Sequence, residues 1–343
     1  MPHLGHHGTT ATQRFPSKML QVSPMKTSHR SLIWAVLALA VVSTLSAKDE
    51  PPANSPAQLV RNAVHNEVAP GGESAAHFMF KNQRKTAHVS QTKLMVETRD
   101  ATAGLLIEQD GHPLSPPQQQ AEEARLQNYI RNPEELNHKR KQEKEDEERT
   151  ARILRALPDA FLYERDGTEQ GTTAVGKPGD KLVGLKFRPN PRYDPPSRVE
   201  QVLTGMQGHL LIDTRENRIA EIDGTLEKDV GFGWGILGHL DRGGRFLVQQ
   251  ADIGNDQWEL THMQLDFTGK VLFFKKISIH SEDVFSDFRP VPPNLTFAQG
   301  VELLKKQVAE NGSSATVPAA KPNEIKTQQK TANQTQENLG CDR

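Results

Sequence analysis

Short runs of β-forming residues recur through most of the chain, and they limit the folds that it can adopt. The runs alternate apolar with polar residues or are rich in β-branched and aromatic residues, as strands are. Turn-forming dipeptides separate several of them: Asp110-Gly111, Asp166-Gly167, Gly243-Gly244, Asn255-Asp256 and Thr268-Gly269. The sequence predicts a mainly β fold, an antiparallel meander over residues 75–81, 92–98, 104–110, 161–169, 181–189, 209–213, 218–226, 245–253, 257–267 and 271–286.

Two consecutive helices interrupt the predicted strands. Ser115 and Gln118 have the spacing of a capping box, and Asn132-Pro133 repeats the start signal. We expect helices over about 116–131 and 133–156. Residues 139–152 include no large apolar side chain, so the second helix should stand mostly in water, held by Glu–Lys and Glu–Arg pairs. A solvated arm is favoured over a helix that binds a partner.

A third helix is expected after the last strand. Thr296 and Gln299 form a second capping box, Asn311-Gly312 is a stop signal, and apolar residues recur at helical spacing at Phe297, Val301, Leu304 and Val308. Such a one-faced helix should dock on the sheet.

The N-terminal region has the order of a secretory signal peptide. Basic Lys26 and Arg30 precede an apolar run from Leu32 to Val42, and small residues follow up to Ala47. The run is shorter than the roughly 20 residues that cross a bilayer, so cleavage is favoured over a permanent anchor. We expect translation to start at Met25 and the product to be periplasmic, with an uncleaved form anchored in the inner membrane as the alternative. Membrane contact through the leader is expected only in that form.

Composition predicts the remaining boundaries. Residues 1–47 form the extension and leader. Residues 48–72 hold four prolines among small and polar residues and are predicted to be a disordered linker. A β domain should span 73–290, with a helical insertion at about 116–157, followed by the C-terminal helix at 291–312. Residues 313–343 are polar and lack aromatics, which predicts a disordered tail.

Several function classes receive no support. With 42 basic and 43 acidic residues the chain has no global field that would attract nucleic acid. The only cysteine, Cys341, excludes an intramolecular disulfide and a thiolate zinc cluster. Residues 233–238 match GxGxxG, but a strand follows where a dinucleotide site needs a helix. We expect no enzyme activity and no cofactor.

A metal site is not expected either. The histidines in or beside strands lack the close, face-matched spacing of metal ligands; they are His209, His239, His262 and His280. Scattered polar positions on a wet face explain them better.

Five local strings, in this order, resemble exported bacterial proteins with the lipoprotein-carrier (LolA/LolB-like) half-barrel fold. They are QDGHPLS at 109–115, PDAF at 158–161, KFRP at 186–189 with Tyr193-Pro195, GHLLID at 208–213 and FSDFR at 285–289. The resemblance implies a curved antiparallel sheet around helices, with a concave apolar surface for acyl chains or a lipidated partner. The charged helical insertion departs from the best-known carriers, and no functional residue is carried over.

Apolar residues fall on one face of several predicted strands: Val183, Leu185 and Phe187; Ala220, Ile222 and Leu226; Met263, Leu265 and Phe267; Val271, Phe273, Ile277 and Ile279. Residues 231–240 alternate glycine with large apolar residues, which suits a bent strand or a lip. Helices either cover this face as an ordinary core or leave part of it for a ligand.

The leading hypothesis is therefore a non-enzymatic periplasmic protein that binds lipid or a lipidated protein. The alternative is a membrane-tethered structural protein of the envelope with a filled core. The candidate ligand-binding residues are Phe187, Ile222, Phe232, Trp234, Ile236, Met263, Leu265, Phe273 and Ile277.

Overall fold

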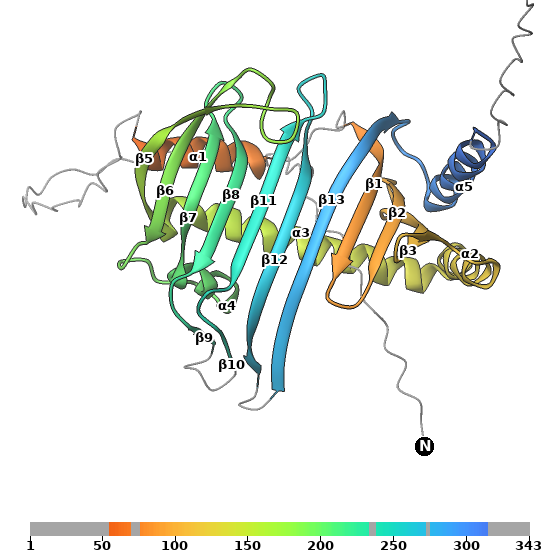
Figure 1. Ribbon diagram of the computed structural model, residues 1–343, viewed down its shortest axis with the longest axis horizontal. Helices are drawn as coiled ribbons and strands as arrows, with labels where there is room; N and C mark the ends of the chain where they lie inside the picture. Colours follow the sequence, from red (N-terminus) through yellow and green to blue (C-terminus); the bar gives the residue numbers. More distant parts are fainter. Residues whose placement is uncertain (1–54, 70–75, 233–237, 272–274, 315–343) are drawn as a thin grey trace, which may run out of the picture.

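One antiparallel sheet organises the molecule. The computed structural model describes residues 55–69, 76–232, 238–271 and 275–314. Strands follow the order β4-β3-β2-β1-β13-β12-β11-β8-β7-β6-β5, with β9 and β10 joined beside β12 (Figure 1). The sheet is open and curved, which confirms the predicted half-barrel class.

The strands are β1 (His77–Thr86), β2 (Ser90–Val96), β3 (Ala103–Gln109), β4 (His112–Pro113), β5 (Phe161–Gln170), β6 (Lys181–Pro189), β7 (Met206–Asp213), β8 (Arg218–Leu226), β9 (Val230–Phe232), β10 (Gly238–Leu240), β11 (Arg245–Asp252), β12 (Trp258–Val271) and β13 (Lys275–Val291). The helices are α1 (Pro56–Glu67), α2 (Pro116–Arg131), α3 (Pro133–Ala160), α4 (Arg198–Gln201), a 3-10 turn at Val202–Gly205, and α5 (Phe297–Ser314).

Turn chemistry explains some of the hairpins. Asp110 and Gly111 both have positive φ, as do Asn255 and Asp256, which is the geometry of tight turns between antiparallel strands. Two predicted turns are wrong. Asp166-Gly167 forms a bulge inside β5, where the register with β6 shifts between Arg165 and Thr168. Thr268-Gly269 lies inside β12, because that strand stays paired with β13 as far as Val271.

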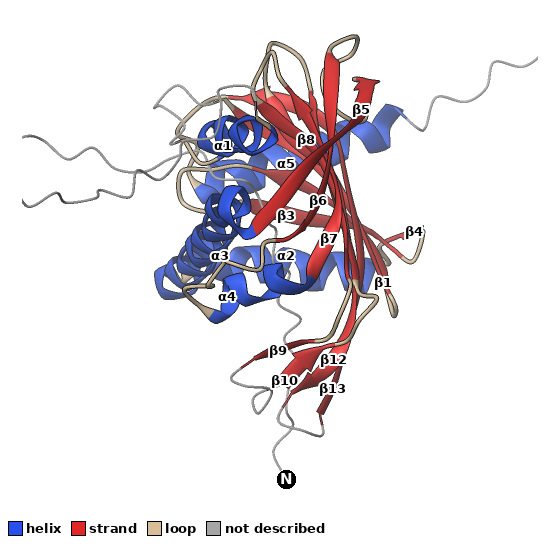
Figure 2. Ribbon diagram, turned by 90° about the vertical axis from the view of Figure 1, so that its left-hand side faces the viewer, coloured by secondary structure: helices blue, strands red, loops and turns tan. Residues whose placement is uncertain are grey.

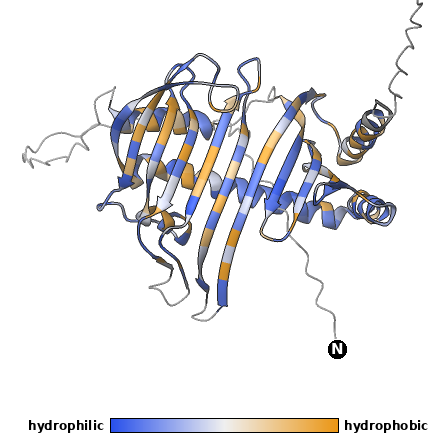
Figure 3. Ribbon diagram, viewed as in Figure 1, coloured by the Kyte–Doolittle hydropathy of each residue, from blue (hydrophilic) through white to orange (hydrophobic). Residues whose placement is uncertain are grey.

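Helices α1, α3 and α4 gather on one face of the sheet (Figure 2). Hydrophobic and hydrophilic residues alternate along the strands, so one face can be buried while the other meets water (Figure 3). The larger core cluster joins α1 and the end of α3 to β5–β8. A second cluster joins α2 and α5 to β1–β3. In the part of the chain that the structure describes, no helix is long and apolar enough to cross a membrane.

Helix α1 corrects the prediction that residues 48–72 form a disordered linker. Pro56 is its first residue and the Ser55 side chain caps it by accepting from the Gln58 amide at 3.2 Å. Val60, Ala63 and Val64 are buried against the sheet and α3. The predicted leader and the tail beyond residue 314 lie outside the described residues.

The other predicted helices are confirmed; the first one has the predicted ends, 116–131, and the other two are longer at their C-terminal ends. The second one continues to Ala160, because Leu154 and Leu157 are buried and Pro158 is accommodated in its last turns. Its first half is mostly exposed, as expected. The last helix continues past Asn311-Gly312 to Ser314.

Candidate functional site

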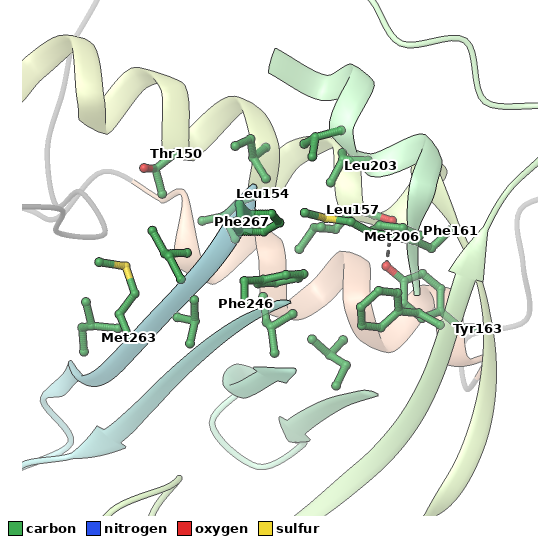
Figure 4. Close-up of a pocket in the computed structure, with 18 residues that line it drawn as sticks. Thr150, Leu154, Leu157, Phe161, Tyr163, Leu203, Met206, Phe246, Met263 and Phe267 are labelled. Atoms are coloured by element: carbon green, nitrogen blue, oxygen red, sulfur yellow. Dashed lines mark hydrogen bonds between the residues drawn. The ribbon is translucent and has the colours of Figure 1, made fainter. Parts of the chain in front are cut away.

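A cavity of about 250 Å³ lies between α3 and the inner face of the sheet. Figure 4 shows side chains from the helix and from the strands pointing into it. Ile153, Leu154 and Leu157 of α3 form one wall. The opposite wall comes from strands β5 to β8, β11 and β12, and the 3-10 turn closes one side.

The lining offers almost no hydrogen-bonding groups. Only Thr150 and Tyr163 among the lining residues have polar side chains. The Tyr163 hydroxyl already donates to the Leu157 carbonyl at 2.7 Å. Burial raises the pKa of Tyr163, so the phenol stays neutral at physiological pH. The cavity therefore suits an apolar ligand.

A glycine lets two aromatic rings lie against the sheet. Gly224 of β8 is the cross-strand neighbour of Phe246 on β11. A Cβ at this glycine would stand 2.3 Å from the Phe246 ring and 3.2 Å from that of Phe187. Because real Cβ atoms essentially never approach to 2.3 Å, any other residue here would displace the Phe246 ring.

Several lining residues remain half-buried. Phe246, Val248, Leu265 and Ile153 are each only partly shielded from solvent although their side chains are apolar. A filled core would bury such side chains fully. The cavity is therefore open on the side of these residues.

Four predicted site residues line the cavity: Phe187, Ile222, Met263 and Leu265. Ile277 does not; it lies half-buried on β13 opposite Gly269. Trp234, Ile236, Phe273 and the side chain of Phe232 lie outside the described residues.

The prediction of site residues missed the wall formed by α3. The sequence did contain a signal for this wall. Ile153, Leu154 and Leu157 are large apolar residues that come directly after a long charged stretch, which indicates that this end of the helix packs against the protein. Phe246 was missed as well, because the sequence of β11, RFLVQQAD, does not alternate and so does not indicate which face Phe246 occupies.

A second, open groove of about 840 Å³ lies along β5–β8. Lys186, His209 and Asp223 are cross-strand neighbours along it. Lys186 pairs with Asp166 at 2.8 Å, and Arg245 pairs with Asp223 at 2.8 Å. The hydrogen bond to Lys186 lowers the pKa of Asp166. These exposed charges neutralise one another, so the groove is a solvated face.

Four histidines of the sheet each lie near a carboxylate. His209 lies 3.7 Å from Asp166, and His280 lies 2.8 Å from Asp266. His239 and His262 likewise have Asp241 and Glu282 within reach. Among the described residues no group of three or more His, Cys, Asp or Glu side chains could hold a metal ion.

The chain matches no family model, no curated protein and no solved structure. The resemblance to lipoprotein carriers therefore stays an expectation from the sequence.

Proposed function

We propose that the protein binds an acyl chain, as part of a lipid or a lipidated protein, in the cavity between α3 and the sheet. The main support for this proposal is that the cavity is large and that its lining is almost entirely apolar. The cavity of about 250 Å³ has apolar walls, and one of its two polar side chains is already hydrogen-bonded. Ligand sites of this kind bind by excluding water from apolar surface.

The size of the cavity argues for an occupant. Apolar walls without a partner lose dispersion contacts, and water that enters from the open side is a poor replacement for them. Apolar cavities of about 150 Å³ stay dry and bind small apolar molecules. A ligand of matching shape would recover the lost contacts.

We further propose that the protein acts without chemistry in the periplasm, in envelope biogenesis or transport. The leader-like sequence from Lys26 to Ala47 supports export. The rival hypothesis is a structural protein of the envelope, tethered by an uncleaved leader. A protein that keeps its leader and binds no apolar probe would favour this rival.

Fatty acids of increasing length, titrated against a bound fluorescent apolar probe, test the proposal. Each buried methylene contributes about 0.8 kcal/mol, so affinity should rise roughly fourfold per carbon. It should level off when the chain fills the cavity. Short and long acids that displace the probe equally well would contradict an acyl-chain site.

Two neighbouring residues of β11 provide matched variants. Val248 lines the cavity, whereas Leu247 is the cross-strand neighbour of Asp223 and Gln264 and is absent from the lining. Because successive strand residues point to opposite faces, Val248→Trp should fill the cavity and abolish probe binding. Leu247→Trp adds the same indole on the other face and should leave binding unchanged. Equal loss in both variants would mean that the probe does not bind in the cavity.

A further inference from the structure

The longest strands extend beyond the rest of the sheet at one end. β12 and β13 stay paired as far as Val271 and Lys275, and β10 adds beside β12 through Gly238. Figure 2 shows the ends of β9, β10, β12 and β13 projecting away from the helices. We call residues 230–232, 238–240, 268–271 and 275–279 the lip.

The lip carries unbalanced positive charge. Lys270, Lys275 and Lys276 are exposed, and none of them forms an ion pair within the part of the chain that the structure describes. The sequence holds no Asp or Glu over 230–240 or over 268–279. Asp241, which borders the first range, lies 3.1 Å from His239 and accepts from Thr268 at 2.7 Å, so it offsets His239 and not the three lysines. The lip is therefore positively charged, although the chain as a whole has a net charge of -1.

The register distributes these lysines over both faces. Lys270 is paired with Lys276 and with His239, and these three residues share one face. Lys275 falls on the opposite face, two residues before Ile277. The charge therefore surrounds the lip rather than marking one side of the sheet.

An apolar strip joins the lip to the cavity. Phe267 lines the cavity and is the cross-strand neighbour of Ile279, which is 44% exposed. Ile277 continues the same face toward Lys275. Apolar side chains left in water next to a ligand cavity form a surface on which a hydrocarbon chain could pass.

We propose that the lip docks on an anionic membrane surface through Lys270, Lys275 and Lys276. Anionic bilayers attract clustered lysines, and the aliphatic stems of lysine can lie on the interface while the ammonium groups stay in water. Docking goes beyond acyl-chain binding in the cavity and does not require it. Together the two would place the apolar strip of Ile277, Ile279 and Phe267, which leads to the cavity, next to the bilayer.

Sedimentation of the full chain with lipid vesicles tests the lip. Binding should be stronger to vesicles rich in phosphatidylglycerol than to phosphatidylcholine alone, and high salt should weaken it. The variant Lys270→Glu/Lys275→Glu/Lys276→Glu should lower the partition coefficient on anionic vesicles about 100-fold. The milder variant with glutamine at the same positions should give an intermediate loss.

The control changes the same charge elsewhere. Lys141, Lys144 and Lys306 are exposed on α3 and α5, and their replacement by Glu should leave vesicle binding nearly unchanged. All variants keep the same N-terminal region, so differences between them report the lip. Equal binding to both kinds of vesicle, or equal losses in lip and control variants, would overturn the proposal. The lip variants should still bind the apolar probe in solution, which separates failure of docking from failure of the cavity.

Discussion

Lys93 of β2 carries a charge that its surroundings disfavour. It is half-buried opposite Asn82 of β1. Burial is the main reason that its pKa falls to about 8, and the positive charges of Arg125, Arg84 and Lys139 act in the same direction. The carboxylate of Glu122 opposes them only in part. Between about pH 8 and the ordinary pKa of lysine, the folded chain therefore holds fewer protons than the unfolded chain.

The free energy of unfolding should accordingly rise as the pH increases from about 8 to about 10.5, by at most about 3 kcal/mol from this residue. Below that window both states hold the proton, and the penalty for burying the charge is fully present. Lys93→Met should therefore be more stable than wild type near neutral pH and should lack this rise. Urea unfolding at a series of pH values from neutral to about 10.5 measures both the difference in stability near neutral pH and the rise at higher pH. The exposed Lys85→Met is the control, and parallel pH curves for wild type and Lys93→Met would refute the idea.

Helix α1 shows how sequence patterns can mislead at the scale of one element. Its start signal, Ser55-Pro56, and the helical spacing of Val60, Ala63 and Val64 are present in the sequence. The surrounding prolines and polar residues outweighed them. The attachment of α1 to the sheet also depends on a residue that is distant in the sequence. The buried Glu67 accepts from Arg218 at 2.9 and 3.1 Å and from the Ile219 amide at 3.0 Å. No local pattern reveals a pair so far apart in the chain.

Replacing Glu67 should loosen α1 from the sheet. Glu67→Ala leaves the Arg218 guanidinium and a buried amide without their acceptor, which should lower the free energy of unfolding by about 3 kcal/mol. A second change, Arg218→Met, should restore part of that loss by removing the unpaired charge. The same helix offers an exposed pair, Arg61 with Asp159, which are 45% and 60% exposed. Arg61→Ala should cost less than about 1 kcal/mol. If chemical denaturation shows similar losses in the free energy of unfolding for Glu67→Ala and Arg61→Ala, the Glu67–Arg218 pair does not hold α1 on the sheet.

The whole molecule depends on contacts that the sequence could not supply. Alternation predicted most strands and several inward faces, because it reflects local geometry. The predicted face of Ala220, Ile222 and Leu226 is wrong at Ala220, which packs in a different cluster because the register of β7 and β8 shifts there. The order of the strands in the sheet, by contrast, depends on contacts between distant parts of the chain. β1 pairs with β13, so the first hairpin joins the sheet beside its last strand. The choice between core and cavity also stayed open. It depends on the separation between α3 and the sheet, and Ile153, Leu154 and Leu157 are too few to bridge it fully.

The cavity should couple ligand binding to the stability of much of the sheet, because its lining comes from α3 and from strands β5 to β8, β11 and β12. A ligand that binds only the folded state adds about 2.7 kcal/mol at 100 times its Kd. For a domain of this size, that gain corresponds to a rise in Tm of roughly 5–10 °C. Thermal scans with excess palmitate should show this rise in wild type and in Leu247→Trp. Val248→Trp should melt at a higher temperature without ligand, because the indole fills the cavity, and should gain nothing when palmitate is added. A shift in Val248→Trp as large as in wild type would mean that the fatty acid stabilises the protein from another site.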